Sequence, residues 1–212
     1  MCAPPDFRDW IEGFDVPFVP LGPELRSTAE PSPAQARPTA EQIRQMMDGT
    51  VATQFETIPV AARGCDVIVA GNALNIAARS VAEQMGIRYV FAAHCPITLP
   101  SPHHAPPKVL AWKSKDETAD NRTLWAEDAE RWSERWGPAF NSHRASIGLA
   151  PVADVRGHVL TDTPWLAADP TLPPWPEPAD PNVFQTCARA KSIAAAVRTD
   201  GAQVAAQRLI SA

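Results

Sequence analysis

Two short apolar runs constrain the fold of this chain more than any other feature. Cys65–Gly71 and Ile87–Ala93 each contain a single charged residue among apolar ones, which is typical of strands buried on both faces of a parallel sheet. A helix is predicted between them over Ala73–Met85, with Gly86 in the left-handed conformation that ends it. Strand, helix and strand with short connections form a βαβ unit, so we expect a Rossmann-like α/β sheet.

Two further elements are predicted before this unit. Val16–Gly22 alternates and contains prolines, which favours a short strand near a sheet edge. Thr39 and Gln42 have the spacing of a capping box, so a helix should begin there and continue until Pro59 ends or kinks it. The predicted apolar face of this helix consists of Ile43, Met46, Met47, Val51, Phe55 and Ile58.

A stripe of large apolar residues predicts a helix in the second half of the chain. Gly137–Pro138 are expected to break it, and a further helix is predicted over Pro138–Ile147 with Gly148 as its cap. We favour core packing over ligand stacking as the role of the stripe. Its members are Trp125, Ala129, Trp132 and Trp136.

Composition excludes several classes of partner. The formal net charge is −5 and no run is rich in Lys or Arg, so nucleic acid and an anionic membrane surface are not expected to bind electrostatically. No apolar stretch approaches the roughly 18 to 20 residues of a transmembrane helix, which leaves only peripheral membrane contact open. The four cysteines form no C-x-x-C pair and no signal peptide is recognised, so we expect a reduced, cytoplasmic protein.

Polar side chains follow the carboxyl ends of the two predicted strands, the edge at which open α/β sheets bind ligands. A loop from His94 to Lys108, rich in proline and histidine, leaves the second strand. Binding of a ligand by these side chains and simple capping of loops are both open as interpretations. The candidate binding residues are Asn72, Asn75, His94, Ser101, His103 and His104.

The usual catalytic motifs are absent from the sequence. It contains no G-x-G-x-x-G, P-loop, G-x-S-x-G or H-E-x-x-H pattern, and therefore no self-sufficient catalytic signature. His103 and His104 are adjacent in a proline-rich loop with no second cluster of ligands, so we reject a metal site there. Asp162 and Trp165 are interpreted as structural.

Several short segments carry a resemblance to a known family through their order and spacing. They are Met1–Asp6, Arg79–Glu83, Met85–Ile87, His94–Pro96, Pro100–Pro102, Asn141–Arg144, Ile147–Leu149 and Thr161–Pro170. Together they resemble the N-terminal, acceptor-side domain of actinobacterial GT-B glycosyltransferases that decorate vancomycin-type aglycones and mycobacterial glycopeptidolipids. The resemblance covers nearly all of Met1–Thr186.

The tail resembles the last helices of the same family. Helices are expected over Ala188–Val197 and Ala202–Ile210, the second docking on the N-terminal domain. In the family a nucleotide-sugar-binding domain precedes this tail, and such a domain needs on the order of 150 residues. The resemblance therefore implies a truncated GT-B N-terminal acceptor-binding domain at 1–186 and remnant C-terminal helices of the GT-B fold at 187–212. The expected fold is an incomplete Rossmann-like parallel sheet with flanking helices, plus those remnant helices.

The family pattern also differs at the front. Its members begin with a buried strand and a Gly-Ser/Thr-Arg-Gly-Asp turn ahead of the segment that matches Met1–Asp6, and the Asp of that turn is the family's presumed general base. The resemblance thus implies no catalytic and no donor-binding residue in this chain. It also implies open strand edges, and hence a poorly cooperative product prone to self-association.

The resemblance implies an activity as well. The expected reaction moves a hexose from a nucleotide-sugar, the donor substrate, to a hydroxyl of a glycopeptide, lipopeptide or lipid acceptor, with no cofactor. The alternative is a non-catalytic remnant that at most binds the acceptor or a partner.

Overall fold

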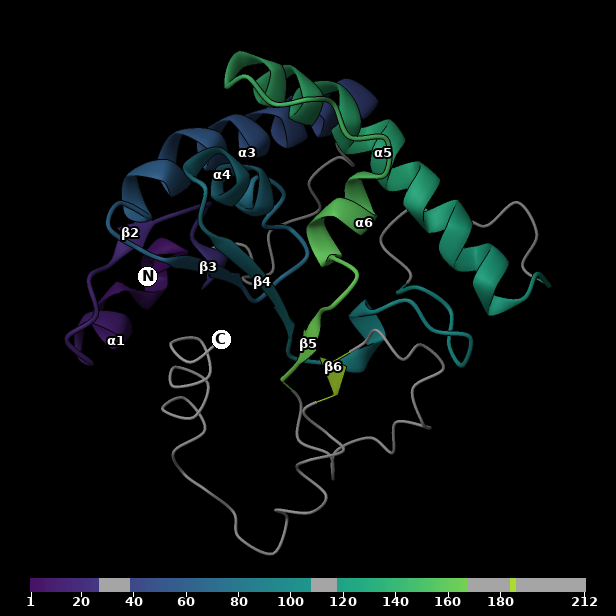
Figure 1. The fold of residues 1–212 in the computed structure, drawn as a ribbon, viewed down its shortest axis with the longest axis horizontal. Coiled ribbons are helices and arrows are strands. Elements are labelled where there is room, and N and C mark those ends of the chain that lie inside the picture. Colours follow the sequence, from purple (N-terminus) through teal and green to yellow (C-terminus); the bar gives the residue numbers. More distant parts are fainter. Residues whose placement is uncertain (27–38, 108–117, 168–183, 186–212) are drawn as a thin grey trace, which may run out of the picture. The chain divides into compact units, whose positions relative to one another are not determined.

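The computed structural model describes residues 1–26, 39–107, 118–167 and 184–185 (Figure 1). The chain divides into two compact units. Unit 1 comprises Met1–Ile68, Leu74–Tyr89 and Ala129–Val159, and unit 2 comprises Val69–Ala73, Val90–Asp128 and Leu160–Ala212. The helices expected over 188–197 and 202–210 lie outside the described residues.

The N-terminal part of unit 1 is a small parallel sheet. Strand β1 (Cys2–Ala3) pairs in parallel with β2 (Val19–Pro20), so the predicted strand near Val16–Gly22 is confirmed in a shorter form. A 3-10 turn, η1 (Pro5–Phe7), and helix α1 (Arg8–Glu12) connect the two strands. The Asp6 carboxylate accepts hydrogen bonds from the backbone N–H groups of residues 25 and 26, both at 2.9 Å. These bonds join the turn after β1 to the segment after β2.

Helix α3 (Ala40–Ala61) begins where the capping box predicts. The Thr39 hydroxyl accepts from the Gln42 backbone N–H at 3.2 Å, and the Gln42 side chain accepts from the Thr39 N–H at 2.8 Å. The predicted apolar face is buried from Met47 onward. It is wrong at Ile43 and Met46, which are 37% and 65% exposed, because the buried face covers only the later turns of the helix.

Helix α4 (Ala78–Met85) packs against α3 (Figure 1) and begins five residues later than predicted. The delay has a local cause in the side chain of Gln54 on α3. Its Nε2 donates to the Leu74 carbonyl at 2.8 Å, and its Oε1 accepts from the Ala77 N–H at 3.1 Å. Because the amide occupies these backbone groups, the preceding residues form turns. Gly86 ends the helix at φ 67°, as predicted.

A second sheet has the strand order β3-β4-β5-β6. Its strands are β3 (Val67–Ala70), β4 (Arg88–Ala93), β5 (Trp165–Leu166) and β6 (Phe184–Gln185). The pairs β4–β5 and β5–β6 are parallel. Parallel sheets with flanking helices confirm the predicted α/β class.

Strands β3 and β4 differ in burial although their sequences are alike. Phe91 and Ala93 of β4 are each 1% exposed, whereas Val69 of β3 is 47% exposed. The prediction that Cys65–Gly71 is buried on both faces is therefore wrong at Val69. The difference agrees with position, since among the strands that the structure describes β4 lies inside the sheet order and β3 stands at its end.

Helix α5 (Asn121–Ser146) continues through the predicted break at Gly137–Pro138. Proline at 138 has no N–H to donate to the carbonyl of Glu134, and its ring crowds that carbonyl. Both residues are exposed, so water can take that carbonyl in place of the missing N–H. Gly148 follows the helix at φ 79°, and a short helix, α6 (Val155–Leu160), comes next.

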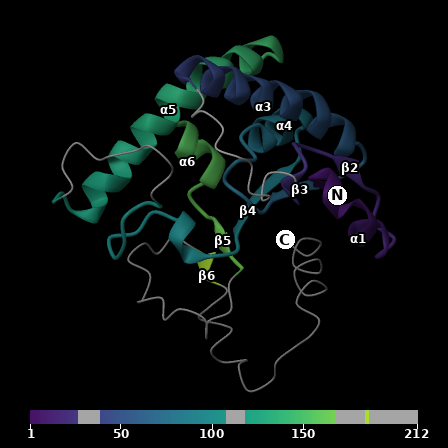
Figure 2. The same ribbon diagram turned by 180° about the vertical axis from the view of Figure 1, so that it is seen from behind.

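The core of unit 1 lies between α3 and α5, which cross in both views (Figure 2). The ring of Phe55 on α3 is 6.0 Å from that of Phe140 on α5 and stacks on His143 at 5.2 Å. Burying one such aromatic side chain contributes about 1.5–3 kcal/mol. In the part of the chain that the structure describes, no helix combines the length and the apolarity that crossing a membrane needs.

Candidate functional site

The carboxyl ends of β3 and β4 meet in unit 2 at His94. The His94 Nδ1 lies 3.1 Å from the carbonyl oxygen of Gly71. A carbonyl can only accept, so Nδ1 carries a proton, and in the corresponding neutral tautomer Nε2 is the acceptor nitrogen. The side chain is exposed. His94 therefore offers a fixed hydrogen-bond acceptor at the sheet edge where the sequence predicts a ligand.

The loop after His94 is anchored by buried apolar residues. A 3-10 turn, η2 (Pro96–Thr98), opens the loop, and the Thr98 hydroxyl donates to the Cys95 carbonyl at 3.0 Å. Leu99 is fully buried. These contacts give the loop a defined conformation although it contains little regular structure.

Ser101 and His104 hold the tip of the loop. Ser101 is buried, and its Oγ accepts from the His103 backbone N–H at 3.1 Å, which forms a tight turn. The His104 Nδ1 lies 3.0 Å from the Ala105 carbonyl, and its ring meets the Trp125 ring edge-on at 5.6 Å. The two side chains thus shape the loop, whereas the His103 side chain is exposed.

The first turns of α5 bind the same loop through two side chains that the sequence did not single out as site residues. Trp125 Nε1 donates to the His104 carbonyl at 2.8 Å, and Asn121 Nδ2 donates to the Pro102 carbonyl at 2.8 Å. Trp125 is 5% exposed, in agreement with the core-packing interpretation. Its polar contact was missed because helical spacing reports the buried ring and not the N–H that the ring carries.

The two asparagines of the predicted site lie in different units. Asn72 is an exposed residue of unit 2, in the turn that follows β3. Asn75 belongs to unit 1, where its carbonyl accepts from the Ala78 N–H at 3.3 Å at the start of α4. Five of the six predicted residues are therefore described within one unit, and Asn75 is not among them.

The side chains exposed at this edge are hydrogen-bonding groups. Exposed imidazole and amide groups at His94, His103 and Asn72 can exchange hydrogen bonds with a hydroxylated ligand. In the described ranges no group of three or more His, Cys, Asp or Glu side chains could hold a metal ion.

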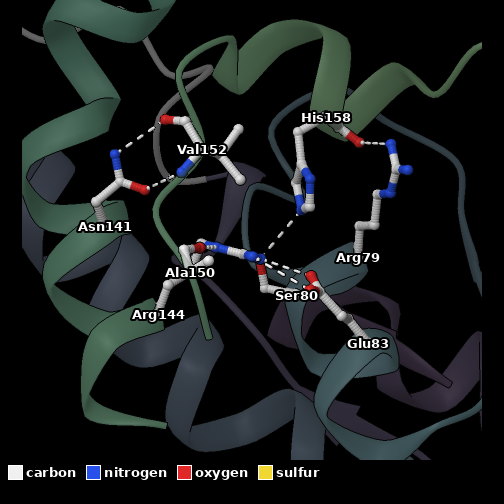
Figure 3. Close-up of polar contacts among 8 residues, drawn as sticks. All are labelled: Arg79, Ser80, Glu83, Asn141, Arg144, Ala150, Val152 and His158. Atoms are coloured by element: carbon white, nitrogen blue, oxygen red, sulfur yellow. Dashed lines mark hydrogen bonds and ion pairs between the residues drawn. The ribbon is translucent and has the colours of Figure 1, made fainter. Parts of the chain in front are cut away.

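A second polar constellation lies in unit 1 around Arg144 of α5 (Figure 3). Its side chain is 3% exposed. The guanidinium donates to both carboxylate oxygens of Glu83, at 2.8 and 3.3 Å, and also to Ser80 Oγ at 2.8 Å. Its Nε donates to the Ala150 carbonyl at 2.7 Å. This bidentate pairing compensates the buried charge and joins α4, α5 and the segment after α5.

His158 of α6 completes the Arg144 cluster. Its Nε2 lies 3.2 Å from Ser80 Oγ, and its backbone carbonyl accepts from Arg79 Nη1 at 2.8 Å (Figure 3). Burial first, and then the positive charges of Arg79 and Arg144, lower the pKa of His158 to about 4. Because the Ser80 oxygen accepts from Arg144, the Ser80 proton can point to a neutral His158 ring. The hydrogen bond to Arg144 holds the pKa of Glu83 below its ordinary value.

Asn141, one turn before Arg144, also bonds the segment after α5. Its side-chain amide exchanges two hydrogen bonds with one backbone residue there, as paired strands do. Its side-chain amide donates to the Val152 carbonyl at 3.0 Å and accepts from the Val152 N–H at 2.8 Å (Figure 3). The segments Arg79–Glu83 and Asn141–Arg144, which the sequence offered only as marks of a resemblance, therefore supply the polar framework of unit 1. The sequence signal that could have identified these residues is a charged or amide side chain on the inner face of an amphipathic helix.

No family model matches the chain, but several curated proteins do. It is 44% identical over 189 residues to glycosyltransferase GtfE and 42% identical over 189 residues to vancomycin aglycone glucosyltransferase, both from Amycolatopsis orientalis. Each alignment covers 88% of this chain and 45% of the relative. A dTDP-epi-vancosaminyltransferase from the same organism is 37% identical over 188 residues. These relatives are vancomycin-group glycosyltransferases.

The alignments confirm the vancomycin-group part of the predicted resemblance. The chain spans slightly less than half the length of the curated relatives it matches. Its parallel sheets and flanking helices are consistent with the N-terminal domain of a GT-B glycosyltransferase. The expected likeness to glycopeptidolipid enzymes, the truncation, and the division at 186–187 stay predictions.

Proposed function

We propose that this chain serves glycosyl transfer as the part that binds the acceptor. In that reaction a hexose passes from a nucleotide-sugar to a hydroxyl of a glycopeptide, lipopeptide or lipid acceptor. The observation that carries the proposal is the 44% identity to a glycosyltransferase over 88% of the chain. One relative is named for its action on the vancomycin aglycone, so a peptide aglycone is the first acceptor to test.

The proposed binding surface is the edge of unit 2 formed by Asn72, His94 and the loop 101–104. His94 would accept a hydrogen bond from an acceptor hydroxyl through Nε2, because Nδ1 is held by Gly71. Asn72 and His103 would add exposed polar contacts, while Ser101 and His104 keep the loop in shape. Asn75 stays in the proposal only because its sequence position follows the strand that ends at Ala70.

The chemistry of transfer sets a further requirement. The acceptor oxygen attacks the anomeric carbon, the bond to the nucleotide diphosphate breaks, and a general base takes the hydroxyl proton. We assign neither the base nor the donor site to a residue of this chain. The second candidate function is acceptor binding without transfer.

One experiment separates the two functions. The purified chain is titrated calorimetrically with vancomycin aglycone, and then incubated with aglycone and a dTDP- or UDP-hexose while product is followed by mass spectrometry. We expect binding that His94→Ala weakens about tenfold, the equivalent of roughly 1.4 kcal/mol, and no product. Thr53→Ala, an exposed polar change on α3, is the control and should bind normally.

Each other result has a defined meaning. Product formation by the purified chain would replace the binding function with the catalytic one. Absence of binding to the aglycone and to lipopeptide acceptors alike, from a folded chain, would overturn the proposal.

A further inference from the structure

The loop that contains the proposed acceptor contacts is held from outside by helix α5. Asn121 is the first residue of α5, and its Nδ2 donates to the Pro102 carbonyl at 2.8 Å. Trp125, one turn later, donates from Nε1 to the His104 carbonyl at 2.8 Å. The two bonds join residues 19 and 21 positions apart in the sequence, all of them within unit 2. The helix therefore takes part in setting where the tip of the loop lies.

The two bonds enclose a single residue, His103. The carbonyls of both its neighbours are bound by α5, and its own backbone N–H donates to Ser101 Oγ at 3.1 Å. Ser101 and Trp125 are 6% and 5% exposed, so two of the three anchoring side chains are shielded from water. The His103 side chain is exposed. An exposed imidazole thus stands on a backbone that is fixed at three consecutive residues.

We propose that His103 is a preorganised contact for the acceptor and that Asn121 is the positioning residue that holds it in place. The inference rests on the proposed function and adds to it a residue on α5, away from the binding edge. A loop that is fixed before the ligand arrives loses less conformational freedom on binding. A neutral imidazole has one donor and one acceptor nitrogen, which suits a hydroxyl group, since a hydroxyl also donates and accepts.

The competing role for Asn121 is stabilisation of the fold alone. The first turn of α5 is already capped by another side chain, because the Asp120 carboxylate accepts from the Thr123 N–H at 2.8 Å. The buried residues Leu99 and Leu124 give the loop and the helix apolar anchors of their own. The bond from Asn121 is therefore expected to set the orientation of the loop tip more than the stability of the fold.

Asn121→Asp separates these two roles. Aspartate has nearly the same shape but no N–H to donate to the Pro102 carbonyl. A carboxylate in the first turn of a helix is favourable, because it lies at the positive end of the helix dipole, so α5 itself is not weakened. We expect little change in melting temperature, faster hydrogen exchange at the His103 amide, and acceptor binding about threefold weaker. Arg122→Gln, an exposed change in the same turn, is the control and should alter neither exchange nor binding.

A double-mutant cycle tests whether Asn121 acts through His103. The four chains are titrated calorimetrically with whichever of vancomycin aglycone and a lipopeptide acceptor the wild-type chain binds. His103→Ala should weaken binding about fivefold. Adding Asn121→Asp to that variant should then change the affinity by less than about twofold, because the imidazole that Asn121 positions is gone. A residue with only a structural role would weaken binding by the same factor in both backgrounds.

The outcomes distinguish this proposal from the proposed function. If the folded wild-type chain binds neither acceptor, both are overturned. If it binds, and Asn121→Asp has no effect or the same effect with and without His103, the proposed function stands and the positioning role is wrong. Unchanged exchange at the His103 amide would also overturn the positioning role, since the Pro102 bond would not be holding the tip. So would a large loss of stability in Asn121→Asp, which would make Asn121 a structural residue.

Discussion

The Arg144 cluster of unit 1 and the His94 edge of unit 2 use the same kinds of side chain for different ends. In the cluster, Arg144 is 3% exposed and bonds Ser80, Glu83 and a backbone carbonyl. At the edge, His94 is exposed and bonds a single carbonyl. Burial and the number of hydrogen-bond partners, and not residue type, therefore separate a structural polar group from one that can meet a ligand.

The greatest loss of stability is expected when the Arg144 cluster loses its arginine. Arg144→Ala removes a buried cation and leaves Ser80 and the Ala150 carbonyl without their donor, so the free energy of unfolding should fall by about 3–5 kcal/mol. Arg144→Lys keeps the charge but not the bidentate geometry, and should cost less. Urea denaturation measures both. A loss below about 1 kcal/mol for the alanine variant would mean that the cluster is no more stabilising than a surface ion pair.

Acid should act on the cluster in the same direction. The pKa of His158 is lowered from 6.5 to about 4, so the unfolded chain takes up a proton that the folded chain refuses as pH falls from 6.5 to 4. Stability therefore decreases over that window, and it decreases further as Glu83, whose pKa is also lowered, is protonated. Because the ring is partly solvated, we expect the His158 contribution to be about 1–2 kcal/mol.

Unfolding experiments between pH 7 and 4 measure this slope. His158→Gln retains a hydrogen-bonding group without a titrating ring and should flatten the profile across the window. An unchanged slope in that variant would assign the acid sensitivity to other groups.

A smaller loss of stability is expected in unit 2, where a buried side chain also bonds a backbone carbonyl. Trp125→Phe keeps a buried ring but removes the donor to the His104 carbonyl, which should cost about 1–2 kcal/mol and speed hydrogen exchange at the tip of the loop. Trp136→Phe, at a half-buried tryptophan of α5, is the control. Equal exchange in both variants would show that the loop is held without Trp125.

The smallest expected effect on stability belongs to His94. His94→Ala should change the free energy of unfolding by no more than about 0.5 kcal/mol, as for exposed positions generally. The same variant should weaken acceptor binding, as proposed above. A large loss of stability with normal binding would make His94 a structural residue and remove the contrast between the two regions.

The sequence predicted the elements whose signals are local. The capping box of Thr39, the left-handed Gly86 and the run Ile87–Ala93 each depend on a few neighbouring residues, and all three are found. The start of α4 was predicted too early because Gln54, more than twenty residues away, occupies the backbone of the preceding turn. Such contacts between distant residues have no signature in periodicity.

The candidate site was predictable in position but not in the roles of its residues. Topology gave the edge and the loop, since carboxyl ends of parallel strands gather there. It could not tell that Ser101 is buried and bonded within its own turn while His103 is exposed. The helix break at Pro138 failed for a related reason, because whether a proline interrupts a helix depends on solvent reaching the carbonyl it leaves behind.

The clamp that Gln54 places on Leu74 and Ala77 has a consequence for how such chains can diverge. Gln54 on α3 fixes the residue at which α4 begins. The length of the turn at Arg63–Gly64, which follows α3, therefore does not have to fix it. We therefore expect α4 to keep its first residue when the length of that turn is changed. Gln54 itself cannot drift in the same way, since glutamate could still accept from Ala77 but would have no proton to give to Leu74.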